Sequence, residues 1–275
     1  MNNAHTQRMN SRPRADDALV LFAKAPVPGQ VKTRLCPPLT DDEAASLHGS
    51  FVLDALERSA QAAIRGVAKH APRFDRFVAC SPSSEHVFFK ILEERNGVRL
   101  IDQMGDDLGG RMEHALAEMF RIGYQRSVIV GTDLPALPAS VYDDAFGLLA
   151  QHDLVLGPSL DGGYYLIGLS RTAPEIFRQI PWSTPDVLTL TQTKAHALGL
   201  KVALLEPQRD VDTVDDVLAL IHDAGLNNAQ GVVSKSNKQK APLLSKRTAD
   251  ALQLIGSRLK ERGAGPTDRT IIPTP

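Results

Sequence analysis

The chain has 275 residues, of which 43% are hydrophobic, and its 31 basic side chains are balanced by 32 acidic ones. This length and apolar fraction allow one large α/β domain, or one such domain with a tail, to bury a substantial core. The net charge of −1 excludes a general attraction to nucleic acid or to an anionic membrane, so neither is expected as a partner. Cys36 and Cys80 lack CxxC spacing, which is typical of reduced thiols in a cytoplasmic protein and indicates no zinc site.

The two ends of the chain differ in composition from its middle. Residues 1–15 are polar and lack the apolar stretch of a secretory signal, so we expect a disordered leader. No run of about 18 apolar residues occurs, so no segment is expected to span a membrane. Residues 227–275 are polar and basic, which predicts a linker and tail with room for one helix at residues 244–262. The catalytic domain is therefore placed at residues 16–226.

In chain order, the first predicted element is a buried strand at residues 18–23, a short continuous apolar run. A capping-box pattern of Thr40 and Glu43 then begins a long helix that extends to residue 65. The following elements are a strand at 77–80, a helix at 84–95, a strand at 98–101, a helix at 108–123, a strand at 127–130 and a helix at 139–150. Strands alternating with helices predict a mainly parallel sheet with helices on both faces.

The alternation changes after residue 150. Two strands, at residues 153–156 and 164–169, are separated only by a glycine-rich turn, which indicates a small antiparallel insertion. A helix at residues 183–198 with Pro185 in its first turn, a strand at 201–205 and a helix at 213–224 complete the pattern. The expected fold class is therefore Rossmann-like α/β.

The loop after the first strand has the sequence KAPVPGQVKTR, from Lys24 to Arg34. Gly29 lets the backbone approach a ligand closely, and Lys32 and Arg34 supply positive charge for a diphosphate. The loop has neither the P-loop pattern nor the GxGxxG pattern. Its alternative interpretation is a surface loop with solvated basic side chains; its position directly after a buried strand favours phosphate binding.

Two acidic segments follow later strands. Asp133, in GTDLPALP, comes directly after the strand at 127–130, where a buried carboxylate needs a positive partner. Mg²⁺ or Mn²⁺ suits such an oxygen ligand, although Asp133 is also placed to cap a helix or brace the turn. Asp210 and Asp212, in RDVDT, are the candidates for a second metal carboxylate, because Asp133 has no local partner.

The glycine-rich turn between the paired strands carries a candidate acceptor site. Asp161 is placed to orient an acceptor hydroxyl or to act as a base, and Gly162 and Gly163 leave space for a substrate. The plain alternative is that Asp-Gly-Gly is a hairpin turn, and both interpretations are compatible. Tyr164 and Trp182 are assigned to the acceptor side, with ordinary strand and helix-start packing as their alternatives.

The segment before the helix at 108–123 reads GDDLGGRM. Asp107 is placed to cap that helix. Arg111 lies near the start of the helix, where a cation opposes the helix dipole, and contact with a base, ribose or phosphate would explain it.

Taken together, FAKAPVPGQVKTRL, DDLGGRM, GTDLPALP, GPSLDGGYYLIGL and DVDT resemble the small bacterial GT-A-type glycosyltransferases of the nucleotide-diphospho-sugar transferase superfamily. Some members are linked to arsenosugar biosynthesis, and the resemblance covers about residues 18–225. It implies a GT-A fold and a nucleotide bound at the first loop, including Lys24, Ala25 and Pro26. It also implies a divalent metal at Asp133, where GTDLP stands in place of the usual DxD. Guanylyltransferases acting on phospholactate and on molybdopterin have a comparable layout.

The expected function is metal-dependent transfer of a sugar from a nucleotide-diphospho-sugar to a small-molecule acceptor. Lys32 and the metal would stabilise the departing diphosphate, and Asp161 would act on the acceptor. The alternative enzyme is a nucleotidyltransferase that releases pyrophosphate from a nucleoside triphosphate. A third hypothesis is a regulatory module that binds nucleotide without turnover.

Overall fold

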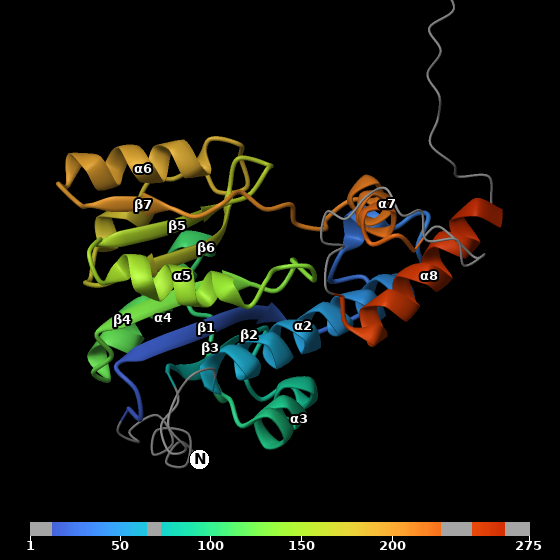
Figure 1. Cartoon of the computed structure of the whole chain (residues 1–275), viewed down its shortest axis with the longest axis horizontal. Coiled ribbons are helices and arrows are strands. Elements are labelled where there is room, and N and C mark those ends of the chain that lie inside the picture. The colour runs from blue at the N-terminus through green and yellow to red at the C-terminus, as the bar shows by residue number, and fades with distance from the viewer. Residues whose placement is uncertain (1–12, 65–72, 227–243, 262–275) are drawn as a thin grey trace, which may run out of the picture.

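The computed structural model describes residues 13–64, 73–226 and 244–261. Most of the predicted leader and the predicted linker at residues 227–243 lie outside these described residues. The described part has an α/β fold: one mixed parallel and antiparallel sheet with helices packed on both faces (Figure 1). None of its helices is both long and apolar enough to cross a membrane.

The sheet has seven strands in the order β3-β2-β1-β4-β6-β5-β7. Their bounds are β1 Asp17–Lys24, β2 Asp75–Ser81, β3 Arg99–Asp102, β4 Arg126–Gly131, β5 Leu154–Pro158, β6 Tyr164–Leu169 and β7 Val202–Leu204. Only β6 runs antiparallel to its neighbours β4 and β5, and the other pairs are parallel. The predicted fold class, mainly parallel with a small antiparallel insertion, is therefore confirmed.

Two layers of helices cover the sheet because alternate side chains of each buried strand face opposite sides. The helices are α2 Asp41–Ile64, α3 Val87–Asn96, α4 Leu108–Arg121, α5 Ser140–Leu149, α6 Val187–Ala197, α7 Val214–Asp223 and α8 Lys246–Glu261, with short 3₁₀ segments η1 Thr33–Leu35 and η2 Pro174–Phe177. Apolar side chains of α2, α3 and α5 pack with Leu19 and Leu21 on one face. Those of α4, η2 and α6 pack with Ala18 and Val20 on the other.

A third apolar cluster lies beyond the edge of the sheet, where α7 and α8 lie beside α2 (Figure 1). It joins Leu47 and Phe51 of α2 to Val217 of α7 and to Leu252 and Ile255 of α8. The C-terminal helix therefore packs directly on the first half of α2.

Helix ends follow local sequence signals at three places. Thr40 and Glu43 form the predicted capping box, in which the Thr40 amide donates to the Glu43 carboxylate over 2.7 Å. Asp107 caps α4 by accepting from the Gly110 amide over 2.7 Å. Thr213 caps α7 through a second capping box.

The helix predicted from residue 183 is wrong at its start, because α6 begins at Val187. Ser183 adopts a left-handed backbone conformation with φ of 65°, which a continuous right-handed helix excludes. The residues before Val187 instead form an irregular segment that faces the carboxyl edge of the sheet, and this segment becomes one wall of a cleft.

Candidate functional site

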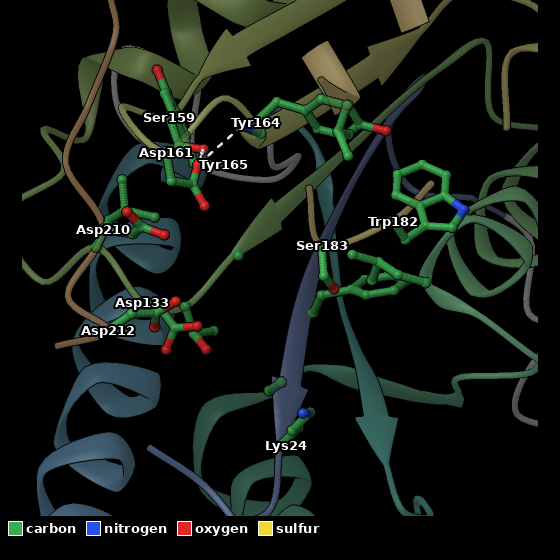
Figure 2. A pocket seen from close by; sticks show the side chains of 18 of the residues that line it. Lys24, Asp133, Ser159, Asp161, Tyr164, Tyr165, Trp182, Ser183, Asp210 and Asp212 are labelled. Carbon is green, nitrogen blue, oxygen red and sulfur yellow. Dashed lines mark hydrogen bonds between the residues drawn. The ribbon is translucent and has the colours of Figure 1, made fainter. Parts of the chain in front are cut away.

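An open cleft of about 780 Å³ lies at the carboxyl ends of β1 and β4, which is the edge where ligands bind in open α/β sheets. It is lined by the end of β1, the loop before η1, the loop after β4, the β5–β6 turn, the segment before α6 and the segment before α7. Figure 2 shows aspartates along one wall and Trp182 with Ser183 on the facing wall.

The sequence-predicted residues that line this cleft are Lys24, Lys32, Arg34, Asp133, Asp161, Gly163, Tyr164, Trp182, Asp210 and Asp212. They come from six separate segments of the chain, and the parallel sheet gathers those segments at one edge. Long-range strand order, rather than proximity in sequence, therefore builds the cleft.

Lys32 joins two of the acidic segments. Its ammonium Nζ lies 2.7 Å from Asp133 Oδ1 and 2.6 Å from Asp212 Oδ1. The Lys32 side chain is only 5% exposed, and its backbone is left-handed at φ 50° and ψ 34°. Lys32 thus meets Asp212, which is 180 positions away in the sequence, at the same point where it meets Asp133.

Asp133 is ionised although its burial disfavours the charged form. Burial by itself would raise its pKa, but the Lys32 ammonium, followed by His48, holds the pKa of this carboxyl well below its usual range. Conversely, burial would lower the pKa of Lys32, and Asp133 and Asp212 together raise it. Lys32 and Asp133 are therefore both charged at neutral pH.

His48, on α2, approaches the same carboxylate. Its Nε2 lies 3.0 Å from the backbone carbonyl of Lys24, and its Nδ1 lies 3.5 Å from Asp133 Oδ1. Because a carbonyl oxygen can only accept, Nε2 is the nitrogen that donates there and Nδ1 is the one that faces Asp133. His48 is thereby fixed to the end of β1 through Nε2, and its Nδ1 lies near the carboxylate after β4 without a hydrogen-bond partner among the described residues.

Two further carboxylates complete the acidic wall. Asp161 Oδ1 accepts from the Ser159 hydroxyl over 2.5 Å and from the Gly163 amide over 3.0 Å, so the turn fixes its orientation. The pKa of Asp210 is raised to about 6, first by burial and then by the negative charges of Asp212 and Asp161. Figure 2 shows Asp161 and Asp210 on the same wall as Asp133 and Asp212.

The facing wall is apolar and rests on α4. The rings of Tyr164 and Trp182 meet edge to face with their centroids 6.4 Å apart. A Cβ on Gly109 would lie 2.3 Å from the Trp182 ring, so only glycine allows the indole to pack against α4 at this position. Trp182 Nε1 is buried and has no hydrogen-bond partner among the described residues.

Five predicted site residues lie outside the lining of the cleft. Ala25 is buried and donates its amide to Ser81, and Pro26 packs against Gly49 of α2. Gly29 is an exposed turn residue with φ of 73°. The Arg111 Nε donates to the Gly105 carbonyl over 3.2 Å.

Gly162 is the fifth of these residues, and its role is in packing. A Cβ there would lie 2.1 Å from the Pro185 carbonyl oxygen, and the Gly162 carbonyl accepts from the Leu188 amide over 3.0 Å. The β5–β6 turn is thus fastened to the segment before α6, which carries Trp182 and Ser183.

Sequence reasoning missed several lining residues, among them the polar side chains of His48, Gln103 and Ser159. Gln103 directly follows β3, so its place at the carboxyl end of a parallel strand was the signal that could have found it. Ser159 stands two residues before Asp161 in a turn, a spacing at which side chains bond locally. His48 lies inside a long helix and gives no local signal.

The family resemblance implies a divalent metal at this site. Within the described residues, no group of three or more His, Cys, Asp or Glu side chains is arranged to hold a metal ion. However, Asp133 Oδ1 is a buried oxygen without a hydrogen bond of good geometry, and it lies with Asp212 Oδ1 around one point. Since Mg²⁺ is commonly held by one or two carboxylates together with substrate phosphates, these residues fit such an ion.

The fold and the cleft define an α/β protein with a polar site at the carboxyl edge of its sheet, and comparisons with known proteins specify its family. A solved structure from Desulfovibrio desulfuricans G20, described as a “putative nucleotide-diphospho-sugar transferase”, is 30% identical. The match covers 90% of this chain and 98% of that chain, with a TM-score of 0.72. The chain belongs to the same family as that protein. The family described as “Uncharacterized protein conserved in bacteria (DUF2064)” matches residues 64–184.

Two more distant solved structures also match the chain. A cytidylyltransferase from Leptospira borgpetersenii serovar Hardjo-bovis (strain JB197) is 14% identical, with 94% of this chain and 100% of that chain covered and a TM-score of 0.47. Molybdopterin-guanine dinucleotide biosynthesis protein A from Archaeoglobus fulgidus is 14% identical, with 72% and 94% covered and a TM-score of 0.44. At this level of similarity neither bears on the reaction. A search of curated proteins gave no match.

Proposed function

We propose that this protein is a metal-dependent glycosyltransferase that moves a sugar from a nucleotide-diphospho-sugar to a small-molecule acceptor. The observation that carries the proposal is the meeting of Lys32, Asp133 and Asp212 at the carboxyl edge of the sheet. Two carboxylates that converge on one point beside a basic loop can hold a divalent metal together with the phosphates of a substrate. The family relationship to a protein described as a nucleotide-diphospho-sugar transferase supports the same reaction class.

On the donor side, Lys24 and Arg34 are exposed at the mouth of the cleft, where they can contact a diphosphate. Lys32 supplies a third positive charge that is already desolvated, and desolvated charge interacts more strongly than charge in water. Asp133 and Asp212 would hold Mg²⁺ or Mn²⁺. When bound, such an ion neutralises negative charge as it develops on the departing diphosphate.

On the acceptor side, the Ser159 hydroxyl and the Gly163 amide hold Asp161 Oδ1, which leaves Oδ2 to accept a proton from an acceptor hydroxyl. Asp210 stands beside it with a pKa raised to about 6, first by burial and then by the negative charges of Asp212 and Asp161. Tyr164 and Trp182 form the apolar surface against which the acceptor would pack.

The test is a thermal-shift screen of nucleotide-sugars and nucleoside triphosphates with Mn²⁺, Mg²⁺ or EDTA. A ligand at about 100 times its Kd stabilises the native protein by about 2.7 kcal/mol, which raises the melting temperature by several degrees. We expect a nucleotide-sugar to give this shift only with metal, and Asp133→Asn to abolish the shift. Asp223→Asn, at an exposed carboxylate of α7, is the matched control and should keep it.

Two outcomes contradict the proposal. If only a triphosphate binds, and a phosphorylated acceptor then releases pyrophosphate, the protein is a nucleotidyltransferase. If nucleotide binds equally in EDTA and in Asp133→Asn without turnover, it is a nucleotide-binding module and the metal assignment is wrong.

A further inference from the structure

The ammonium of Lys32 stands between the two carboxylates that the proposed function assigns to a metal ion. It lies 2.7 Å from Asp133 Oδ1 and 2.6 Å from Asp212 Oδ1, so it interacts with both oxygens at once. These contacts are comparable in length to strong charged hydrogen bonds. The Lys32 ammonium and a divalent ion bound by the same two oxygens therefore cannot occupy this point at the same time.

Replacement of the Lys32 ammonium by a free divalent ion is unfavourable in these surroundings. Lys32 is 5% exposed, and an ammonium that leaves two carboxylates inside the protein must either find new negative partners or remain buried without them. Free Mg²⁺ or Mn²⁺ brings positive charge and no anion for Lys32.

A metal ion that arrives with a diphosphate changes this balance. Asp133 and Asp212 would hold the metal, and the phosphate oxygens would offer negative charge to the displaced Lys32 ammonium. A diphosphate without metal meets the opposite difficulty, because it approaches four carboxylates while the nearest buried cation is already paired. Only the combined ligand replaces every ion pair that it breaks.

We infer that Lys32 is a resident cation that excludes free divalent metal from Asp133 and Asp212, so that the ligand recognised is the metal–diphosphate complex. The inference rests on the proposed function and specifies its donor substrate. No covalent bond is made or broken: the Lys32 ammonium would exchange its two carboxylate partners for phosphate oxygens. Metal and diphosphate must then bind with positive and reciprocal coupling.

The direct test measures Mn²⁺ binding by electron paramagnetic resonance, with and without inorganic pyrophosphate, which carries the diphosphate without base or sugar. The variants are Lys32→Met, which keeps an unbranched chain but removes the charge, and Lys24→Met, which removes one exposed charge at the same cleft. For wild type, we expect pyrophosphate to tighten Mn²⁺ binding about tenfold or more. Lys32→Met should bind free Mn²⁺ about tenfold more tightly than wild type, whereas Lys24→Met should not.

A second measurement covers the stability of the variant. Without Lys32, the Asp133 and Asp212 carboxylates face each other unscreened, so Lys32→Met should melt earlier than wild type in EDTA. Mn²⁺ should restore the melting temperature of Lys32→Met. Without pyrophosphate, Mn²⁺ should leave the melting temperature of wild type unchanged. Adding Asp133→Asn to Lys32→Met should remove the gained Mn²⁺ affinity, which locates the ion.

The outcomes separate the inference from the proposed function. If wild type binds free Mn²⁺ as tightly as Lys32→Met does, and pyrophosphate still brings Mn²⁺ to Asp133, the inference is wrong and the proposed function stands. If no variant binds Mn²⁺ with or without pyrophosphate, both are wrong.

Discussion

Asp75, at the start of β2, is a charged residue whose side chain has no exposed surface. Its carboxylate accepts from the Arg14 amide over 2.8 Å and from the Tyr124 hydroxyl over 2.7 Å, and it forms an ion pair with Arg99 over 2.8 Å. Burial by itself would raise its pKa, but these three partners hold the pKa of Asp75 below its usual range. The partners lie on separate segments, so this buried charge links Arg14, β3 and the segment between α4 and β4.

Asp75→Asn is expected to lower the free energy of unfolding by about 2–4 kcal/mol at pH 7, because it leaves buried donors without their charged acceptor. A carboxyl whose pKa is lower in the folded state contributes stability above its unfolded pKa of about 3.9, and this contribution is lost as pH falls through the folded pKa. The difference between wild type and variant should therefore shrink below about pH 4. Urea titrations at neutral and acidic pH measure it.

Asp223→Asn serves as the matched control, since the Asp223 side chain is 65% exposed. Its unfolding free energy should stay within about 0.5 kcal/mol of wild type throughout the pH range. An Asp75→Asn deficit that remained constant into acid would contradict the assigned charge network.

At the scale of elements, the contact between α4 and the segment before α6 sets the shape of the apolar wall. Gly109 lies in the first turn of α4, and Trp182 packs on it so closely that a Cβ would lie 2.3 Å from the ring. Gly147, in α5, provides a comparison, because a Cβ there would meet no atom within 4 Å. The two glycines are both helical and differ in what covers them.

Gly109→Ala and Gly147→Ala are therefore expected to act in opposite directions. Alanine in an open helical position usually stabilises by about 0.5–1 kcal/mol, so Gly147→Ala should raise the melting temperature. Gly109→Ala should instead displace Trp182 and cost about 1–3 kcal/mol through overpacking. Trp182 is the single tryptophan of the chain, so a red shift of its fluorescence reports the displacement directly. An unshifted emission maximum in Gly109→Ala would show that the indole does not rest on α4.

The same region shows where prediction of elements from sequence stopped. Strands β1 and β4 were recognisable from the sequence, because each is buried on both faces and therefore has a continuous apolar segment. The start of α6 was not, since Pro185 suits a first helical turn and the local pattern favours one there. Its actual conformation depends on the close approach of Gly162 to the Pro185 carbonyl, a contact between distant segments.

The candidate site followed the same division. Asp133, Asp161 and Asp212 were recognisable because each follows a predicted strand, and carboxyl ends of parallel strands share an edge. The bridge from Lys32 to two of them depends on the order β1-β4-β6-β5 in the sheet, which no local pattern specifies. Likewise His48 reaches the cleft only because α2 packs across the end of β1.

At the scale of the whole molecule, the C-terminal helix is connected to the rest of the chain by both polar and apolar contacts. The Asp54 carboxylate of α2 accepts from Arg247 over 2.8 Å and from the Thr248 hydroxyl over 2.7 Å. Apolar residues of α8 cover Leu47 and Phe51, on either side of His48 in the α2 sequence. The boundary at residue 226 stays a proposal, and these contacts indicate that α8 helps to position the helix that carries His48.

Two leucines of α8 test whether this helix is an integral part of the fold. Leu252 is fully buried in the cluster with α2 and α7, whereas Leu254 is 73% exposed on the same helix. Leu252→Ala is expected to cost about 2–4 kcal/mol, because it removes buried methyl groups and leaves a cavity. Leu254→Ala, with the same change in helix propensity, should stay within about 0.5 kcal/mol of wild type.

Denaturant unfolding followed by circular dichroism and by Trp182 fluorescence measures both variants. If α8 belongs to one cooperative unit, Leu252→Ala shifts the two signals together, although Trp182 lies in a different apolar cluster. If the fluorescence transition stays at its wild-type midpoint, α8 unfolds separately and the tail is an appendage that the catalytic domain does not need for stability.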